Sequence, residues 1–216
     1  MDEPMSGCVD IKPMLWAVAQ QPKSGETSSG DAALVLEMPQ GCLLAVTDAL
    51  GHGEEAELVA SRANEALRRR APGTVLQLLD SCNEALRMTR GAAMSLAWVH
   101  YGDNTLTWLG VGNVNGILLR AGAAGEGSRE YLLCRAGIVG VQIPPPYAAM
   151  TSIAPDDVLL LYTDGIDPNR IARFSDRLMP PDRAAPLLLR ECAVSHDDAL
   201  VLVARYAGQA ALGAGA

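Results

Sequence analysis

Short apolar runs, many of them alternating with polar residues, recur along most of the chain and predict β-strands. The predicted strands are Leu15–Gln20, Ala32–Met38, Cys42–Asp48, Ala93–His100, Thr105–Gly112, Gly116–Arg120, Val158–Asp164 and Ala199–Tyr206. Two shorter runs, around Tyr131–Cys134 and Met150–Ile153, are candidates for further strands.

Two helices are expected between Asp48 and Gly91, because apolar residues recur there at spacings of three and four. One stripe contains Ala56, Val59, Ala60, Ala63 and Leu67, and the other contains Val75, Leu78, Leu79, Cys82 and Leu86. Thr74 and Gln77 have the spacing of a capping box, which predicts the start of the second helix. A third helix is expected over Pro181–Cys192.

The order of the elements is strands, a helical pair, a long series of strands, and then a helix and a last strand. This order lacks the strand–helix alternation of a parallel sheet and indicates the α+β class. So many strands favour two stacked, mostly antiparallel sheets with helices outside. A chain of 216 residues buries roughly 70% of its surface on folding. We therefore expect a single domain over residues 1–216, with a frayed tail from about residue 208.

Composition and charge exclude several classes of protein. A hydrophobic content of 49% is too high for a disordered chain, and apolar runs such as Val158–Tyr162 are too short to span a membrane. Met1–Asp10 lacks the apolar stretch of a secretory signal. The net charge is −8 and basic residues cluster only at Arg68–Arg70, so a nucleic-acid partner is not expected. Five scattered cysteines without a C-x-x-C pair indicate buried thiols in a cytoplasmic protein.

Aspartates stand at the ends of several predicted strands. Asp48 ends one apolar strand, Asp164 ends another, and Asp197 lies just before the last strand. If the last strand is antiparallel to the other two, these three residues meet at one edge of the sheet. Asp31 precedes its own strand and joins them for the same reason.

Each aspartate has an ordinary explanation when it is considered alone. Asp164 precedes glycine in a common turn sequence, and Asp197 belongs to a loop that leads into a strand. Taken together, clustered carboxylates without cations would repel each other strongly. Two divalent ions supply a charge of +4, and hard oxygen ligands suit Mg²⁺ or Mn²⁺. The three histidines, His52, His100 and His196, fit no short zinc-binding spacing.

The segment Asp48-Ala-Leu-Gly-His-Gly53 resembles the D-G-x-G-x-G segment of the SpoIIE branch of the metal-dependent protein phosphatases (the PPM family). Thr163-Asp-Gly165 and Asp197-Asp-Ala-Leu200 resemble the later T-D-G and D-D-x-T/L elements of this branch, in the same order. Ser29-Gly-Asp31 resembles its first acidic element.

The stretch from Gly112 to Arg120 resembles the central hairpin of this branch. The whole resemblance extends from about Trp16 to Tyr206 and implies a four-layer α-β-β-α sandwich. It also implies a site of two ions, Mn²⁺ or Mg²⁺, that carries catalysis through Asp48, Asp164 and Asp197.

Within that implied site, Asp48 bridges the two ions, while Asp164 and Asp197 bind the first. The carbonyl of residue 49 binds the second, Asp31 holds metal-bound waters, and Asp198 orients its neighbours. Ala49 departs from the family pattern, which has glycine there. Alanine serves equally if its φ is negative, whereas a positive φ would cost about 1–2 kcal/mol.

The resemblance implies hydrolysis by a metal-bridging hydroxide that attacks phosphorus in line. His52 and His196 are candidates for protonating the leaving group, although a loop histidine without chemistry is the more ordinary explanation of each. A catalytic domain of this size without a sensor domain resembles the stressosome phosphatase of the branch. The expected partner is therefore a phosphorylated serine/threonine regulatory protein of the stressosome, and the enzyme is expected to be a monomer.

Two rival functions stay open at this stage. The first is a PPM-like module that binds regulatory proteins after losing its metal chemistry, and Ala49 is the one feature in its favour. The second is a metal-dependent hydrolase of small phosphoesters.

Overall fold

The computed structural model describes residues 13–122, 128–173 and 179–208, and these residues form ten strands and four helices. The strands are β1 (Met14–Gln21), β2 (Asp31–Met38), β3 (Gly41–Ala49), β4 (Ala92–His100), β5 (Thr105–Val111), β6 (Asn115–Leu119), β7 (Arg129–Leu132), β8 (Ala149–Ser152), β9 (Val158–Tyr162) and β10 (Ala199–Tyr206). The helices are α1 (Glu54–Arg70), α2 (Val75–Ala85), α3 (Pro168–Arg173) and α4 (Pro181–Cys192). Cys8 and almost all of the tail predicted from about residue 208 lie outside the described residues.

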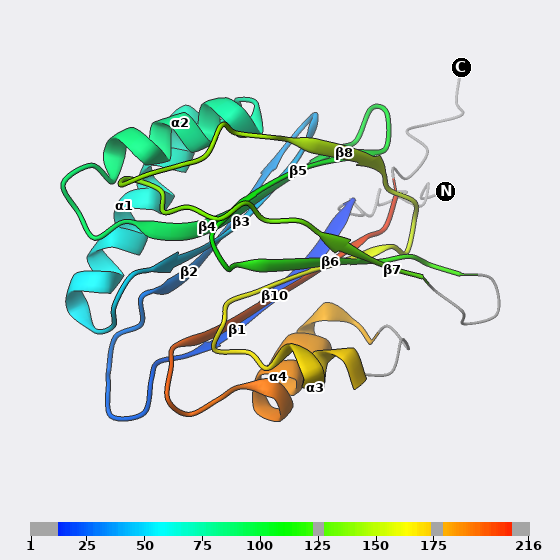
Figure 1. Ribbon diagram of the computed structural model, residues 1–216. Coiled ribbons are helices and arrows are strands. Elements are labelled where there is room, and N and C mark those ends of the chain that lie inside the picture. Colours follow the sequence, from blue (N-terminus) through cyan, green and yellow to red (C-terminus); the bar gives the residue numbers. More distant parts are fainter. Residues whose placement is uncertain (1–12, 123–127, 174–178, 209–216) are drawn as a thin grey trace, which may run out of the picture.

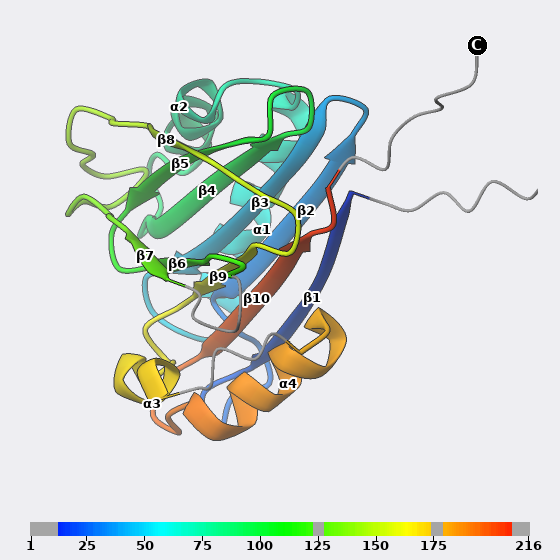
Figure 2. The same cartoon turned by 90° about the vertical axis from the view of Figure 1, so that its right-hand side faces the viewer.

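The strands form two antiparallel sheets that stack face to face. One sheet has the order β1-β10-β9-β6-β7 and the other has the order β2-β3-β4-β5-β8. Helices α1 and α2 cover the outer face of the second sheet, and α3 and α4 cover the outer face of the first (Figure 1). Figure 2 shows α4 lying across β1 and β10. The predicted α+β sandwich of four layers is confirmed.

Three apolar clusters fill the three spaces between the four layers. Strand β3 shows how one sequence serves two of them, because successive side chains point to opposite faces. Leu43 and Ala45 pack toward α1 and α2, whereas Leu44 and Val46 pack between the sheets. The third cluster joins the first sheet to α4. Strands buried on both faces explain why several runs in the sequence are continuously apolar.

The predicted helices are confirmed, and one helix was missed. The Thr74 hydroxyl accepts a hydrogen bond from the Gln77 amide at 3.3 Å, and the Gln77 side chain accepts one from the Thr74 amide at 3.2 Å, so the capping box is present. Helix α3 has six residues and buries only Ile171, which is too little to produce a helical period. Among the described residues, no helix is long and apolar enough to cross a membrane.

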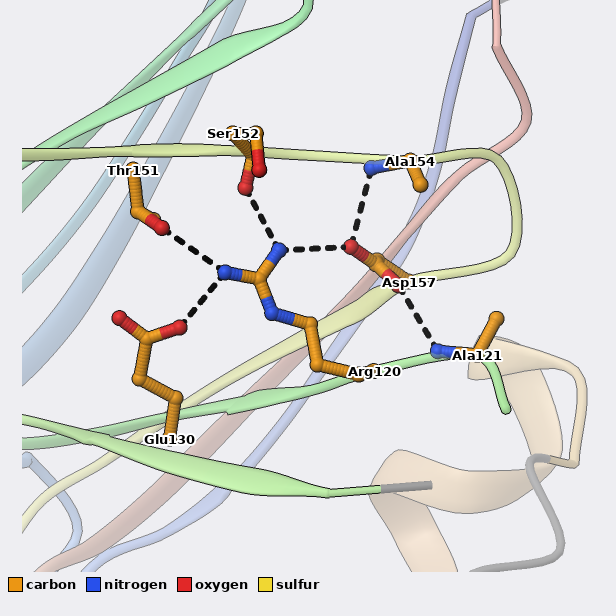
Figure 3. A network of polar contacts seen from close by, with 7 residues as sticks. All are labelled: Arg120, Ala121, Glu130, Thr151, Ser152, Ala154 and Asp157. Carbon is orange, nitrogen blue, oxygen red and sulfur yellow. Dashed lines mark hydrogen bonds and ion pairs between the residues drawn. The ribbon is translucent and has the colours of Figure 1, made fainter. Parts of the chain in front are cut away.

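A network around Arg120 joins the two sheets where β6 ends and β9 begins (Figure 3). The guanidinium donates to four acceptors over 2.6–3.0 Å: Asp157 Oδ2, Glu130 Oε2, Thr151 Oγ1 and the Ser152 carbonyl. Asp157 is 1% exposed and also accepts hydrogen bonds from the amides of Ala121 and Ala154. Its buried charge is therefore compensated by groups of the protein itself.

Candidate metal centre

Asp31 and Asp48 are direct neighbours on the second sheet. Asp31 begins β2, Asp48 is the penultimate residue of β3, and the two are paired in the β2–β3 register. Asp31 is 4% exposed. Gly30 precedes it because there is no room for a side chain: a Cβ at Gly30 would lie 2.8 Å from Ala56 Cβ and 3.1 Å from the Ala49 carbonyl oxygen. Two carboxylates opposite each other on neighbouring strands are unfavourable unless something offsets their charge.

Asp164 and Asp197 come from loops of the first sheet. Asp164 lies two residues beyond the end of β9, and Asp197 lies two residues before the start of β10, which is antiparallel to β9. Gly165 allows these loops to meet, since a Cβ there would lie 1.9 Å from the Asp198 carbonyl oxygen. The Asn113 side chain donates to Asp164 Oδ2 at 2.6 Å.

The expected meeting of Asp48, Asp164 and Asp197 at one edge of a single sheet is wrong. Strand β3, which carries Asp48, belongs to the other sheet from β9 and β10. The carboxylates instead come together across the sandwich, at the end where β3 and β9 finish and β10 begins. The local pattern of a strand does not indicate which of two stacked sheets it enters.

Two side chains hold the sheets together at this end. The Thr163 hydroxyl donates to Asp31 Oδ2 at 2.7 Å and thereby links the loop after β9 to β2. The two carboxylate oxygens of Asp198 accept hydrogen bonds from the amides of Lys23 and Gly30, each at 2.7 Å. Asp198 therefore fixes both ends of the loop between β1 and β2 against the start of β10.

Burial and mutual repulsion raise the pKa values of the central carboxyl groups. Burial, followed by the charge of Asp48, raises the pKa of Asp31 to about 8, against a smaller lowering by the Thr163 hydrogen bond. Burial and then the charges of Asp164, Asp197 and Asp198 raise the pKa of Asp48 to about 7. Burial and Asp197 also raise the pKa of Asp164, although the bond from Asn113 lowers it. These groups are electrostatic neighbours despite their separation in the sequence.

The donors at this end of the sandwich have the chemistry of a site for hard divalent ions. Within residues 13–122, 128–173 and 179–208, no ion pair joins Asp31, Asp48, Asp164 or Asp197 to a lysine or arginine. In the same part of the chain, no three His, Cys, Asp or Glu side chains are arranged closely enough to hold a metal ion. The carboxylates are thus electrostatic neighbours, but they do not surround a single point at metal-binding distances. The assignment of individual ligands stays a prediction.

Ala49 does not carry the backbone strain that a positive φ would impose. The non-glycine residues with positive φ in the described chain are Met88, Asn104 and Asp156. Ala49 is the last residue of β3, and its amide donates to the Gly30 carbonyl at 3.1 Å. Ala49 therefore lies in ordinary extended backbone.

The three histidines have different surroundings. His52 lies in the loop between β3 and α1, and its Nδ1 is 2.8 Å from Glu26 Oε1. His196 is exposed in the loop before β10. His100 ends β4, away from the aspartates, and accepts a hydrogen bond from the Trp98 indole at 3.0 Å.

Sequence reasoning missed three side chains that contact the candidate site or its loops. Thr163 and Asn113 lie inside segments that resemble family motifs, so the motifs marked their positions without indicating their contacts. Glu26 has no sequence signal, because its partner His52 is 26 residues away on another loop.

Residues 39–207 match the family model of stage II sporulation protein E (SpoIIE). The chain belongs to the SpoIIE family. A relative in this group is the phosphoserine phosphatase RsbX of Bacillus subtilis (strain 168), which is 26% identical over 151 residues, covering 69% of this chain and 73% of RsbX.

Solved structures share the SpoIIE-family fold seen here. One described as the bacterial stressosome has a TM-score of 0.79 and 26% identity, covering 90% of this chain and all of the matched chain. RsbX in complex with magnesium also has a TM-score of 0.79, with 21% identity, covering 89% of this chain and 94% of that one. The resemblance to this family, expected from short motifs, is confirmed.

Proposed function

We propose that this protein is a metal-dependent protein serine/threonine phosphatase. The observation that carries the proposal is the gathering of Asp31, Asp48, Asp164 and Asp197 from both sheets at one end of a SpoIIE-family sandwich. No Lys or Arg among the described residues forms an ion pair with these four aspartates, and divalent cations would supply the missing positive charge. The relation to a protein named as a phosphoserine phosphatase supports this activity.

In this proposal the site holds two ions, Mn²⁺ or Mg²⁺. Asp48 would lie between them, Asp164 and Asp197 would bind the first, the Ala49 carbonyl would bind the second, and Asp31 would hold their waters. When bound, the ions supply positive charge for the phosphoryl oxygens and a water of lowered pKa.

The other residues at this end of the sandwich position the ligands. Thr163 fixes the direction of the Asp31 carboxylate through its 2.7 Å hydrogen bond, and Asn113 does the same for Asp164 at 2.6 Å. Because these partners come from different strands, the stacking of the two sheets sets the distance between the donors. Thr163 and Asn113 therefore restrict the orientations of two of the donors before the ions and the phosphate bind.

The substrate in this proposal is a phosphoserine or phosphothreonine on a bacterial regulatory protein, namely a component of the stressosome. The likeness to RsbX and to a structure of the bacterial stressosome supports this choice. We place the enzyme in the cytoplasm and infer that it acts as a monomer. With a net charge of −8, attraction of an anionic substrate must come from the ions and from local contacts around them.

The direct test is phosphate release from a phosphorylated stressosome protein with Mn²⁺ or Mg²⁺, with and without a chelator. We expect release that depends on metal and falls at least about 100-fold in Asp48→Asn, because a metal-bridging charge is lost. Asp80→Asn, an exposed position on α2, is the matched control and should retain full activity. Metal-dependent release by Asp48→Asn at the normal rate would refute the proposed site.

A second comparison tests the substrate class. The folded phosphoprotein, its isolated phosphopeptide and a small aryl phosphate are assayed at equal metal concentration. A higher kcat/KM for the folded protein supports selection by a docking surface. Preference for the small ester would instead favour a phosphoester hydrolase, and binding of the phosphoprotein without release would favour a regulatory module.

A further inference from the structure

We propose that a surface patch beside the candidate metal centre docks the folded phosphoprotein substrate. The members of this docking patch are the exposed side chains of Leu50, Arg87, Met88, Arg90 and Val141. They come from three connecting segments: β3 to α1, α2 to β4, and β7 to β8. The inference rests on the proposed phosphatase function and names the surface that recognises the substrate protein apart from its phosphate. The partner that fits presents an apolar side chain next to a carboxylate, close to its phosphorylated residue.

Backbone pairing places the docking patch next to Asp48. Ala49 pairs with Ala92 where β3 ends and β4 begins, one residue pair beyond Asp48. Ala92 and Val139 exchange hydrogen bonds, with the Val139 amide donating at 2.9 Å and the Ala92 amide at 3.1 Å. In Figure 1 the chain between β7 and β8 accordingly reaches the end of the sandwich at which β3 finishes. The patch is therefore continuous with the candidate metal centre through paired backbone.

The segment that carries Val141 also lies beside the loop that contacts Asp164. A Cβ at Gly112 would lie 3.4 Å from the carbonyl oxygen of Gly137. The next residue, Asn113, donates its side-chain hydrogen bond to Asp164. A protein bound on the docking patch would therefore lie next to aspartates of both sheets.

Gly91 allows the three segments to meet. Its carbonyl accepts a hydrogen bond from the Leu50 amide at 3.0 Å. A Cβ at Gly91 would lie 2.5 Å from Ile138 Cγ2 and 3.0 Å from Val141 Cγ2, and its φ of 79° also favours glycine. The absence of a side chain thus brings the segments of Leu50 and Val141 together on one surface.

Met88 is held outward by a strained turn. It is 102% exposed and has a φ of 64°, whereas the other non-glycine residues with positive φ in the described chain are an asparagine and an aspartate, which adopt this conformation more readily. The Thr89 hydroxyl fixes the turn by donating to the Leu86 carbonyl at 2.6 Å and accepting from the Gly91 amide at 3.0 Å. Strain that presents a fully exposed apolar side chain indicates a function for that side chain. Methionine suits such a function because it adapts to apolar partners of varied shape.

Two arginines give the docking patch positive charge in a chain whose net charge is −8. Arg87 and Arg90 flank the turn of Met88, and their side chains are 66% and 54% exposed. Each is paired with an exposed glutamate, Glu84 or Glu55, and exposed pairs of this kind contribute little energy. The guanidinium groups can therefore exchange these partners for carboxylates of a bound protein. This charge complements a phosphoprotein, which is anionic around its phosphorylated residue.

The test compares kcat/KM on the folded phosphoprotein with kcat/KM on p-nitrophenyl phosphate, which is too small to reach the docking patch. Met88→Gln and Val141→Gln should each lower kcat/KM on the phosphoprotein about 5-fold through a higher KM, and the double variant about 30-fold. Turnover of p-nitrophenyl phosphate should change by less than about 2-fold. Arg90→Gln should lower kcat/KM on the phosphoprotein at low salt and have a smaller effect at high salt, because salt screens an exposed charge.

Met150→Gln is the matched control for these substitutions. Met150 is a second exposed methionine, at 70%, and it lies on β8 opposite Thr107 of β5, away from the end of the sandwich that carries the aspartates. The control should leave both rates unchanged. Met88→Gly should weaken docking as Met88→Gln does while raising the midpoint of thermal unfolding, because glycine relieves the positive φ. Circular dichroism confirms that each variant is folded.

Binding of the phosphoprotein in the presence of a chelator separates this inference from the proposed function. The double variant should bind with a Kd about 30-fold higher than the wild type, measured by fluorescence anisotropy. If the wild type binds in this way but releases no phosphate with Mn²⁺, the phosphatase function fails and the docking patch stands. Equal losses on both substrates, or unchanged kinetics and binding in the double variant, would overturn the inference. A sedimentation change in the double variant alone would also overturn it, because the patch would then join two copies of this chain.

Discussion

Strand β9 has an aspartate near each of its ends, and the two residues have opposite surroundings. Asp157, just before the strand, is bound by Arg120 and by two backbone amides (Figure 3). Asp164, just beyond it, lies among other carboxylates, and burial together with Asp197 raises its pKa. At one end of β9 the protein supplies a cation and hydrogen-bond donors to the aspartate. At the other end the aspartate lies in a region of excess negative charge.

This difference separates a structural network from a candidate functional site. At the Arg120 end, the cation and its acceptors join both sheets and complete their own hydrogen bonds. At the acidic end, folding brings Asp31 and Asp48 together against their mutual repulsion. Proteins tolerate such unfavourable clusters where function requires them. The comparison predicts that substitutions at the two ends change stability in opposite directions.

The largest effect on stability is expected at the compensated end. Arg120→Met removes the cation and leaves Asp157, which is 1% exposed, as a buried charge. We expect a loss of about 3 kcal/mol in the free energy of unfolding, measured by urea denaturation. Arg87→Met is the matched control, because its ion pair with Glu84 is exposed and should contribute less than about 1 kcal/mol. Equal effects of the two substitutions would show that the Arg120 network is not structural.

The second prediction concerns the acidic end without metal, where Asp48→Asn should stabilise the fold. Folding raises the pKa of Asp48 from 3.8 to about 7, so the folded state favours the protonated group. Below pH 3.8 the group is protonated in both states, and stability is then lost as the pH rises toward 7. The variant should gain about 2 kcal/mol at pH 8 in the presence of a chelator and almost nothing near pH 3.5.

Urea denaturation at both pH values measures this gain. Adding Mn²⁺ should then stabilise the wild type more than the variant, since only the wild type retains the full set of carboxylates. Destabilisation by Asp48→Asn at pH 8 without metal would contradict the proposed repulsion.

Local sequence patterns predicted most elements of this fold because each strand and helix carries its own period. The continuously apolar run of β3 follows from its position between two apolar layers, and α4 matches the predicted Pro181–Cys192. The motifs also marked the aspartates at the strand ends. The pattern could not indicate that Asp48 and Asp164 lie on different sheets, because that depends on how the strands are paired over long separations. For the same reason, the contacts of Glu26 with His52 and of Thr163 with Asp31 were found only in three dimensions.

The smallest effect is expected for Ala49→Gly, which returns the acidic end to the family pattern. Ala49 is the last residue of β3 and does not have a positive φ, so a change to glycine relieves no backbone strain. Its methyl group is buried in the cluster beneath α1, and removing it should cost about 1 kcal/mol of stability. Metal-dependent phosphate release per folded molecule should change by less than about 2-fold, since the main-chain oxygen is retained. Thermal unfolding and steady-state kinetics on one preparation measure both quantities. A collapse of activity in a folded variant would show that the methyl contact, rather than the carbonyl alone, determines the geometry beside Asp48.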